Sequence, residues 1–441
     1  MTRILSFLVV CFCVVTIEAA EWRHWRGPFY NGSTDETGLP DQFSQTENIR
    51  WTAELPGRSA ATPIVCKDSV FISSTDPRAE KLLGLCFGRE DGQLRWKREI
   101  GEELGKDHRS TFAAPSPVTD GDVVVFFYGN GLLAAFDFDG TRLWTRDIQK
   151  ERGEFAFLWT FSSTPLLHDG KLYLQVLQRD VPVGGRGLQG RENASYILAM
   201  DPRTGEQLWR VTRPSKAVAE SREAFSSPIP FEHDGRREIL VAGGDCATGH
   251  DPETGEELWR WGTWNPRRIP HWRLVPSPVA GGDIILFCAP KKAPLHAIKA
   301  GGRGTLDDEA IQWVSDDVRE LTSDVATPAF YDGDFFVLSK LRRCVSRVER
   351  ETGEAKWTTS LPSRVPFEAS PLLADGKVYM VSHSGLVVIA DADNGSILQE
   401  IPMAETSGDP VRSSIAAAGG NLFLRTNRKL FCIGETEGGS R

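Results

Sequence analysis

The chain has 441 residues, of which 40% are hydrophobic and 25% charged, and it carries a formal net charge of −9. This composition is typical of a folded globular protein, and the negative charge argues against non-specific nucleic-acid binding, because phosphate contacts need a basic surface. The 42 glycines and 26 prolines indicate many turns, and therefore many short strands instead of long helices.

The first twenty residues are predicted to be a signal peptide. Arg3 provides the positive start, residues 4–15 form an apolar run, and Ala19-Ala20 offers small residues for cleavage. The run is shorter than the ~20 residues of a membrane-spanning helix. We therefore expect an exported protein, periplasmic or extracellular, and peripheral association with a membrane is compatible with this. Six scattered cysteines follow, which we expect to be buried thiols.

Residues 21–46 show no strand alternation and contain Trp22 and Trp25. They predict an irregular N-terminal arm that lies across the folded body with its tryptophans tucked in. A strand around Trp51 comes next, and one repeated unit then accounts for the chain as far as residue 434. Residues 435–441 remain as a C-terminal tail.

Seven units begin with a small hydroxyl residue and a proline, as at Ser227-Pro228, and an eighth opening at Ser413-Ser414-Ile415 lacks the proline; in seven of the units the first hairpin turn is Asp-Gly or Gly-Gly. The turn before the fourth strand follows the pattern Asp-x-x-Thr-Gly, as in residues 251–255, and a Trp comes four residues after the Gly. A Trp at this position offers a large flat surface for packing against the neighbouring unit. We therefore assign a structural role to the tryptophans of the repeat and of the N-terminal strand: Trp51, Trp96, Trp144, Trp209, Trp259, Trp313 and Trp357.

Eight such openings occur, but the eighth unit ends without a fourth strand, and the strand around Trp51 has no unit of its own. The strand around Trp51 can therefore supply the fourth strand that the eighth unit lacks. The sequence therefore predicts an all-β, eight-bladed β-propeller of four-stranded antiparallel blades, closed by the N-terminal strand joining the last blade. A stacked solenoid is the alternative for such a period, but closure removes the exposed edge strands of an open array.

The phrase Asp-x-x-Thr-Gly-x-x-Leu-Trp, together with the Ser/Thr-Pro openings, resembles the pyrroloquinoline-quinone (PQQ)-type propeller repeat over residues 47–434. That repeat occurs in eight-bladed quinoprotein dehydrogenases and in non-enzymatic relatives such as the outer-membrane β-barrel assembly scaffold. The opening Trp22-Arg23-His24-Trp25-Arg26-Gly27-Pro28 looks like the start of exported bacterial PQQ-like repeat proteins with no assigned reaction. Because a fold does not carry a function, the function depends on the residues of the site.

The loops from each Trp to the next Ser/Thr-Pro converge on one face of a propeller, and here they hold the most unusual residues of the chain. Arginines beside aromatic rings suit an anionic or carboxylate-bearing ligand. The alternative is a ring of salt bridges that lets charged loops crowd a narrow mouth. The candidate ligand-binding residues are His108, Arg109, Trp159, Arg222, Arg268, His271, Trp272, Arg273, Asp324 and Arg412.

The resemblance implies specific requirements for a quinone cofactor. The resembling enzymes combine a calcium ion, held by carboxylates and an amide, with a catalytic Asp, and many carry a ring formed by adjacent cysteines. This chain has no adjacent cysteine pair, and no segment aligns with the metal ligands. Asp324 and Asp409 are the only face-loop aspartates that we consider as a base. We assign no catalytic residue, no metal ligand and no cofactor; PQQ with calcium belongs to the alternative function only.

Three other motifs have structural interpretations. Residues 391–395 look like the start of a calcium loop but lie in register with the other repeat turns, so we expect a hairpin turn. Residues 184–187 are glycine-rich and predict a flexible insertion in the third blade. Gly243-Gly244-Asp245 and His250 are predicted to break the third strand of the fourth blade, as a bulge would.

The sequence thus favours an exported binding or scaffold protein that uses the convergent loop face of the propeller. We expect a protein or a small anionic ligand as the partner, no nucleic acid, and a monomer. The alternative is a PQQ-dependent alcohol or sugar dehydrogenase. Carbohydrate binding is a third hypothesis that no sequence feature favours.

Overall fold

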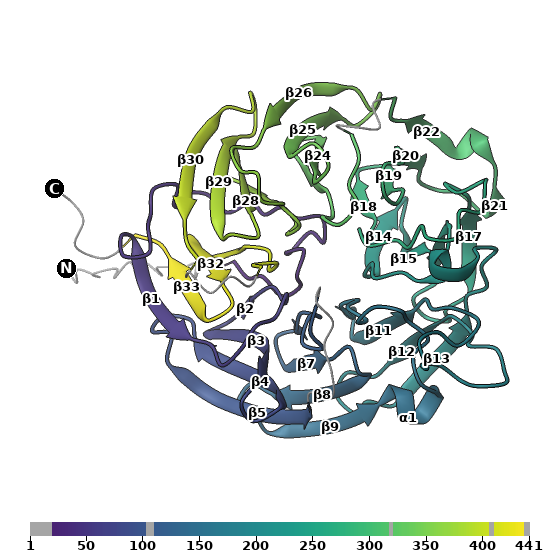
Figure 1. The fold of residues 1–441 in the computed structure, drawn as a ribbon, viewed down its shortest axis with the longest axis horizontal. Helices are drawn as coiled ribbons and strands as arrows, with labels where there is room; N and C mark the ends of the chain where they lie inside the picture. Colours follow the sequence, from purple (N-terminus) through teal and green to yellow (C-terminus); the bar gives the residue numbers. More distant parts are fainter. Residues whose placement is uncertain (1–19, 103–109, 317–320, 405–409, 436–441) are drawn as a thin grey trace, which may run out of the picture.

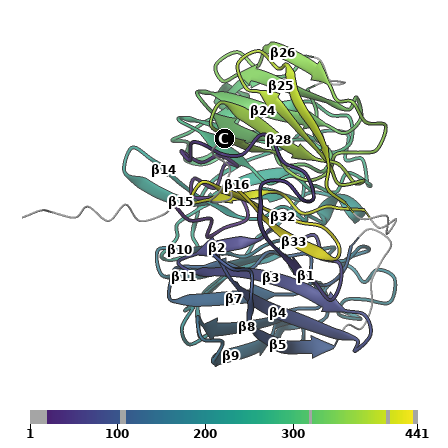
Figure 2. The same ribbon diagram turned by 90° about the vertical axis from the view of Figure 1, so that its left-hand side faces the viewer.

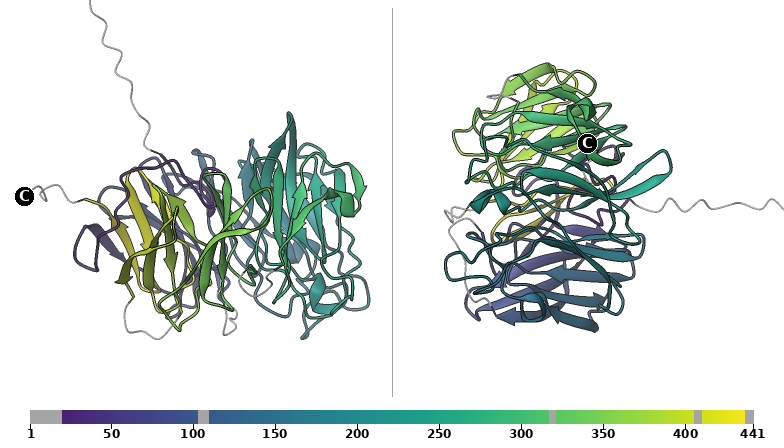
Figure 3. Two further views of the ribbon diagram at one scale, coloured as in Figure 1. Left: turned by 90° about the horizontal axis from the view of Figure 1, so that it is seen from above. Right: turned by 90° about the vertical axis from the view of Figure 1, so that its right-hand side faces the viewer.

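The computed structural model describes residues 20–102, 110–316, 321–404 and 410–435. These residues form eight β-sheets that follow one another around a ring in sequence order (Figure 1). Each blade has four antiparallel strands, with the innermost near the axis and the fourth toward the rim; blade 4 gains a fifth, parallel strand, and blade 8 takes its fourth from the N-terminus. Edge-on views show the strands running between the two faces of the ring (Figure 2 and Figure 3). The predicted all-β, eight-bladed propeller is confirmed.

The first half of the ring contains blades 1 to 4. Blade 1 consists of β2 (Ile64–Cys66), β3 (Ser69–Asp76), β4 (Lys81–Gly88) and β5 (Leu94–Glu102). Blade 2 consists of β6 (Val118–Thr119), β7 (Val123–Phe127), β8 (Leu132–Asp137) and β9 (Arg142–Asp147), followed by the short helix α1 (Ile148–Arg152). Blade 3 consists of β10 (Leu166–His168), β11 (Lys171–Val176), β12 (Tyr196–Met200) and β13 (Gln207–Thr212). Blade 4 consists of β14 (Ile229–His233), β15 (Arg236–Gly243), β16 (Cys246–His250) and β17 (Glu257–Trp261), and the 3-10 helix η1 (Ala219–Arg222) precedes it.

The second half contains blades 5 to 8. Blade 5 consists of β18 (Val279–Gly281), β19 (Ile284–Cys288), β20 (Leu295–Lys299) and β22 (Ile311–Val314), with β21 (Gly304–Leu306) and η2 (Asp308–Ala310) before its last strand. Blade 6 consists of β23 (Ala329–Tyr331), β24 (Asp334–Ser339), β25 (Cys344–Glu349) and β26 (Ala355–Ser360). Blade 7 consists of β27 (Leu372–Ala374), β28 (Lys377–Val381), β29 (Leu386–Asp391) and β30 (Ile397–Pro402). Blade 8 consists of β31 (Ala416–Ala418), β32 (Asn421–Arg425), β33 (Lys429–Ile433) and the N-terminal strand β1 (Ile49–Glu54).

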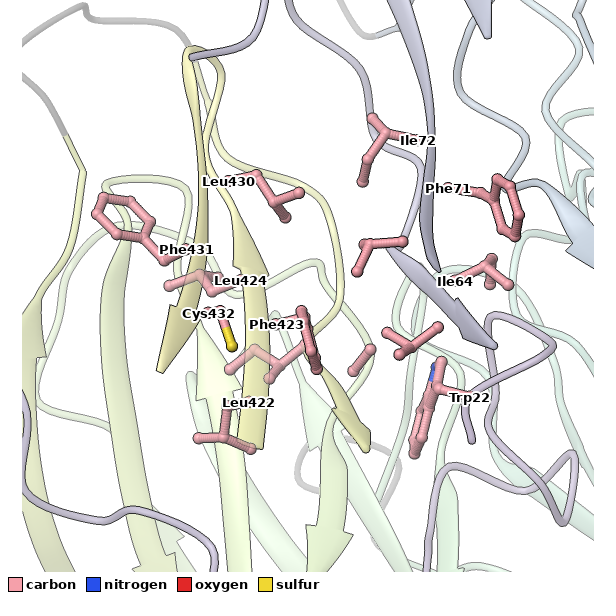
Figure 4. Packing of buried hydrophobic residues seen from close by; sticks show 14 of the residues in the cluster. Trp22, Ile64, Phe71, Ile72, Leu422, Phe423, Leu424, Leu430, Phe431 and Cys432 are labelled. Carbon is pink, nitrogen blue, oxygen red and sulfur yellow. The ribbon is translucent and has the colours of Figure 1, made fainter. Parts of the chain in front are cut away.

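The ring closes where β1 pairs with β33, with Trp51 opposite Cys432 in an antiparallel register. This is the predicted closure. Arg425 reinforces the junction between the last and first blades: it is fully buried and donates to the carbonyl oxygens of Ser73 (2.8 Å) and Gly57 (3.0 Å). Apolar side chains of blades 8 and 1 belong to one buried cluster, together with Trp22 of the N-terminal arm (Figure 4).

The repeat phrase forms a joint between neighbouring blades. In blade 3, Trp209 donates from Nε1 to the carbonyl oxygen of Pro252 in the next blade (3.2 Å), and its ring lies against Gly255 of the same turn. A Cβ at Gly255 would come within 2.6 Å of the ring, so only glycine fits there without a shift. The same indole-to-turn hydrogen bond recurs from Trp51, Trp96, Trp144, Trp313 and Trp357 to the blade that follows each of them. These tryptophans are structural.

The junction between blades 4 and 5 departs from this rule. Blade 5 lacks the Asp-x-x-Thr-Gly turn, and its chain instead extends to form β21, which pairs in parallel with β17 at the rim of blade 4. Trp259 therefore has no turn carbonyl to bond, and its Nε1 donates to the buried carboxylate of Glu238 (2.5 Å). Blade 4 is consequently five-stranded.

The N-terminal arm crosses the face formed by the first hairpin of each blade (Figure 1, purple). Trp22 makes an antiparallel bridge with Val65 of blade 1, and Tyr30 meets His168 of blade 3. Gly32 and Thr34 exchange backbone hydrogen bonds with β27 of blade 7. The arm thus spans the ring from one side to the other.

The structure corrects one sequence-based prediction. Gly244 and Asp245 do not interrupt a third strand: they form the tight turn between β15 and β16, where positive φ angles of 62° and 60° are needed. The bulge lies farther along, between Gly249 and His250. Residues 391–395 form a repeat turn, as predicted, with the Asp391 carboxylate accepting from two backbone N–H groups.

Two further expectations concern cysteines and membrane helices. The six described cysteines are free and buried, as predicted. Among the described residues, no helix has the length and apolarity that crossing a membrane requires. Residues 1–19, which contain nearly all of the predicted signal peptide, lie outside the described residues.

Candidate functional site

A cup of about 220 Å³ lies on the axis of the propeller. Its wall is built from the segments that lead into the first strand of each blade, and its lining includes side chains from all eight blades. The arm contributes Trp25 to the same lining. The cup is therefore assembled by the whole ring, and it is the place where residues far apart in sequence converge.

A ring of hydroxyl groups surrounds the cup. The Ser or Thr that opens each blade donates its backbone N–H to the side-chain oxygen of the equivalent residue in the next blade, at 2.8–3.1 Å. Seven such bonds join the eight members in order: Thr62, Ser116, Thr164, Ser227, Ser277, Thr327, Ser370 and Ser414. At the seam between the last and first blades, Ser413 Oγ instead donates to the carbonyl oxygen of Ala61 (2.9 Å).

This ring explains why the repeat begins with a hydroxyl residue. The side-chain oxygen satisfies a backbone N–H that has no strand partner, which a buried donor requires. Since seven of these oxygens act as acceptors, their own O–H groups remain available, and among the described residues none of them donates to another protein group. The ring therefore offers hydrogen-bond donors toward the axis.

The arm lies at the floor of the cup. Trp25 lines the cup, and its indole N–H has no partner among the described residues. Arg26 lies next to it, with its guanidinium carbon 5.3 Å from the Trp25 ring centroid. Arg26 is 2% exposed and donates to the carbonyl oxygens of Pro328 (2.6 Å) and Pro371 (3.2 Å). The arm thereby ties two blades together beneath the cup.

One side of the rim carries an aromatic and charged cluster. Trp159 lies under the Arg273 guanidinium, 5.7 Å from ring centroid to guanidinium carbon. Glu220 accepts from both of them, at 2.6 Å from Arg273 Nη1 and 3.2 Å from Trp159 Nε1. The three side chains hold one another in place, so the charge of Arg273 is already balanced by a carboxylate.

The opposite side of the rim is centred on Glu368, which is largely buried. Its carboxylate contacts Lys340, His383 Nε2 at 2.8 Å and Arg412 Nε at 3.3 Å. Burial by itself would raise the pKa of Glu368, but hydrogen bonds from His383 and Lys340 outweigh it and hold that pKa well below its usual range. Glu368 is thus a carboxylate at neutral pH and is surrounded by cationic side chains.

A second buried carboxylate lies behind the rim. Glu223 has a fully buried side chain that accepts from Arg179 Nε (2.5 Å) and from the backbone N–H of Leu158 (3.2 Å). Burial raises the pKa of Glu223 to about 7, although the bond from Arg179 acts in the opposite direction. Because its oxygens face Arg179 and the backbone of Leu158, Glu223 supports the loop that carries Trp159.

The structure brings together three of the ten predicted ligand-binding residues. Trp159, Arg273 and Arg412 line the cup. Trp272 packs, partly buried, against the apolar core of blade 4, and its backbone N–H donates to Ser221 Oγ (2.8 Å).

Four others have different roles or positions. Arg222 pairs with Asp180 (3.0 Å), and Arg268 is exposed and donates to the carbonyl oxygen of Lys216 (3.0 Å). His271 is exposed. Asp324 does not line the cup: its carboxylate accepts from the backbone N–H of Lys291 (2.8 Å) and thus caps a loop. The remaining predicted residues, His108 and Arg109, and the considered base Asp409 lie outside the described residues.

Much of this face therefore consists of salt bridges between its loops, which was the alternative to a ligand site. Arg222, Arg273 and Arg412 each contact a carboxylate. Sequence reasoning missed two components of the cup: the hydroxyl ring, whose members it recognised only as openings of the repeat, and Trp25. The signals were present, since a polar residue recurs at the innermost position of every blade and the arm contains a Trp-Arg pair. What could not be predicted is that the arm reaches the axis.

The residues present do not fit a calcium-bound quinone. Calcium takes six to eight oxygen ligands, usually including several carboxylates. Glu368 is the one carboxylate among the described residues that line the cup, and it is engaged by three cationic or imidazole side chains. The described residues also contain no cluster of three or more His, Cys, Asp or Glu side chains that could hold a metal ion.

Comparison with known proteins supports the fold. Three overlapping segments, residues 42–179, 158–399 and 302–440, match the family model described as outer membrane protein assembly factor BamB. No curated protein matches the chain in sequence.

Solved structures resemble the chain at low identity. A europium-containing methanol dehydrogenase has a TM-score of 0.66 at 10% identity, covering 92% of this chain and 89% of its own. The quinohemoprotein alcohol dehydrogenase of Comamonas testosteroni has a TM-score of 0.66 at 12% identity, with 94% and 81% covered. BamB from Moraxella catarrhalis has a TM-score of 0.57 at 15% identity, with 87% and 96% covered. At such identities the likeness shows the fold alone, which dehydrogenases and BamB share.

Proposed function

The chain belongs to the BamB family of PQQ-like repeat propellers, and from this premise we propose that it is an exported binding or scaffold protein whose ligand or partner enters the cup on the propeller axis. The family's description as an assembly factor implies work done through contacts with other proteins. In this chain we place such contacts at the cup on the propeller axis.

The observation that supports the proposal is the form of the cup. Trp25 lines its floor with the buried Arg26 beside it, while Trp159, Arg273 and Arg412 lie at its rim. A concave site with an aromatic wall and a few fixed polar groups is the usual form of a recognition site. With a volume of about 220 Å³, the cup accommodates a side chain, a chain terminus or a small molecule, but not a folded domain.

The side chains of the rim are held in fixed positions, which favours specific binding over a general electrostatic attraction of charged molecules. Glu220 fixes Arg273 over Trp159, and Glu368 fixes Arg412. Side chains that are held before binding lose little conformational entropy when a ligand arrives. Trp and Arg are also the residue types that contribute most to binding at the centre of protein interfaces.

The proposal is tested by photo-crosslinking in the cell envelope of the organism that makes the protein. A photo-reactive amino acid placed at Val325, which lines the cup, should give a discrete adduct identifiable by mass spectrometry. The same amino acid at Asp234, whose side chain is 91% exposed in the β14–β15 hairpin (Figure 2), serves as the control and should give none. Adducts from position 234 with none from position 325 would place the binding surface elsewhere.

The alternative function, a PQQ-dependent dehydrogenase, has a separate test. Purified protein is incubated with PQQ and calcium, and dye-linked oxidation of alcohols and sugars is measured. The binding proposal predicts no turnover. Turnover that disappears in Glu368→Gln, which alters the one described carboxylate in the cup, would establish the enzyme instead.

A further inference from the structure

A buried positive charge lies beside Trp25 of the cup, and no carboxylate of the described residues neutralises it. Arg26 is fully buried, and its guanidinium bonds only to backbone carbonyl groups, those of Asn31, Pro328 and Pro371. Burial lowers the pKa of Arg26 to about 9, so the group is still charged at pH 7. Buried charges are normally paired, because an unpaired charge in a low-dielectric interior is costly.

The position of this charge relative to the hydroxyl ring is fixed by sequence. Pro328 and Pro371, which accept from Arg26, directly follow Thr327 and Ser370, two members of the ring. The guanidinium therefore lies close to two members of the ring and beside Trp25, although Arg26 itself does not line the cup. A fixed charge at the closed end of a narrow, low-dielectric cavity attracts the opposite charge into it.

The polar groups around this position are donors. The ring oxygens accept backbone N–H groups and leave their O–H groups free, and the Trp25 indole N–H has no partner among the described residues. A buried donor without an acceptor is destabilising, because it has lost its hydrogen bonds to water. An acceptor with a negative charge would satisfy both the donors and Arg26.

The arm motif is built to hold these groups there. A Cβ at Gly27 would come within 2.7 Å of the Trp22 ring, and one at Gly32 would overlap the Arg26 guanidinium, so both glycines let the arm fold closely around its own side chains. Trp22 in turn is anchored to blade 1 by the bridge to Val65. The conspicuous Trp-Arg-x-Trp-Arg-Gly-Pro sequence thus serves to present Trp25 and Arg26 at the axis.

We propose that the throat of the cup, lined by the hydroxyl ring and Trp25 next to the buried Arg26, is an oxyanion site that receives a carboxylate of the bound ligand. This inference rests on the proposed function and names the chemical class that the cup recognises. A carboxylate on a small molecule, on an acidic side chain or at a chain terminus has the same chemistry here. A phosphate monoester would use the same donors and is the competing source.

The test uses acetate and acetamide, which have nearly the same shape and differ in charge. Their methyl signals are followed by saturation-transfer NMR in titrations of the purified full-length protein at constant ionic strength. Acetate should bind at least about tenfold more tightly than acetamide, because hydrogen bonds to a charged acceptor are roughly twice as strong as those to a neutral one. Inorganic phosphate, added as a competitor, distinguishes the two sources. If phosphate displaces acetate at phosphate concentrations well below that of acetate, the throat is a phosphate site.

Matched variants place the binding in the throat. Thr164→Val removes one ring hydroxyl, and Trp25→Phe removes the free indole N–H; each should weaken acetate binding about tenfold. Thr119→Val deletes a buried hydroxyl in the first hairpin of blade 2, and Trp264→Phe deletes an indole N–H outside the cup that has no partner among the described residues; neither should change the affinity. If a throat variant does not fold, the acetate-to-acetamide ratio of the unmodified protein still decides.

Equal binding of acetate and acetamide, or no binding of either, would overturn the oxyanion site and leave a water-filled throat. Equal effects of the throat and control variants would overturn its location. These failures are separate from failure of the proposed function. Crosslinks from position 325 together with equal binding of acetate and acetamide would refute the oxyanion site alone. Preferential acetate binding together with crosslinks from position 234 and none from position 325 would refute the proposed binding face alone.

Discussion

The strongest structural prediction concerns the glycine of the repeat phrase. In blade 6, Gly353 has a φ of +76°, and a Cβ there would lie 2.5 Å from the Trp313 ring of blade 5. Gly333, in the first hairpin of the same blade, has nearly the same φ, +78°, but nothing lies within 4 Å of its Cβ position. Gly353→Ala and Gly333→Ala therefore share the backbone strain and the loss of unfolded-state freedom, and they differ only in the contact with Trp313.

The expected magnitudes follow from these two terms. An alanine in the left-handed region costs about 1–2 kcal/mol, and this applies to both variants. Overpacking a buried contact costs about 1–3 kcal/mol more, and this applies to Gly353→Ala alone. Trp313 has little freedom to yield, because it is 7% exposed and donates to the carbonyl oxygen of Arg350 at 2.7 Å.

Urea unfolding of the two variants, compared with the unmodified protein, measures the difference directly. Gly353→Ala should lose about 1–3 kcal/mol more stability than Gly333→Ala. Adding Trp313→Leu to Gly353→Ala should cost less than the sum of the single changes, because the smaller side chain relieves the clash. If the two glycine variants are equally destabilised, the interpretation of the phrase as a joint between blades is wrong.

Two other predictions address the seam and a buried carboxylate. Arg425→Met removes the hydrogen bonds to Ser73 and Gly57 that link the last blade to the first, and should cost about 2–4 kcal/mol; a melting temperature within error of the unmodified protein would contradict this role. Burial raises the pKa of Asp245 to about 7, so its stabilising contribution is full below pH ~4 and is lost as the pH rises through 7. Asp245→Asn keeps an acceptor for Asn265 and should raise the free energy of unfolding at pH 8 by up to about 4 kcal/mol, with no gain at pH 4; an equal gain at both pH values would contradict the titration.

The fold could be predicted because its determinants are local and repeated. Asp251 accepts from two backbone N–H groups of its own turn, and Gly255 supplies the positive φ angle of 76° that the turn needs. The same solution appears in several blades, so the period is visible without reference to any long-range contact. Ring closure followed from counting, since the strand around Trp51 had no other partner.

The site was only partly predictable because it is built from residues that are distant in sequence. Arg273 and Arg412 face the axis, but Arg222 and Arg268 leave the same kind of loop in other directions. A loop sequence gives the charge of a side chain and not its direction. Likewise, Asp324 has the composition of a candidate base but serves a backbone N–H 33 residues away.

The largest gap between sequence and structure is at the arm. Nothing local to residues 21–46 indicates that Arg26 bonds to Pro328 and Pro371, more than 300 residues later. That contact depends on the completed ring, whose centre exists only when all eight blades are in place. For the same reason the hydroxyl ring could be seen only as a series of repeat openings.

Whether the cup is the binding surface can be measured even while its partner is unidentified. Because the six described native cysteines are buried, Val325→Cys introduces an accessible thiol at the cup, and Asp234→Cys introduces one on the opposite face. Rates of maleimide modification are compared between purified protein and protein in the native cell envelope. We expect modification at position 325 to be slowed in the envelope while modification at position 234 is unchanged. Equal rates at position 325 in both preparations would contradict binding at the cup.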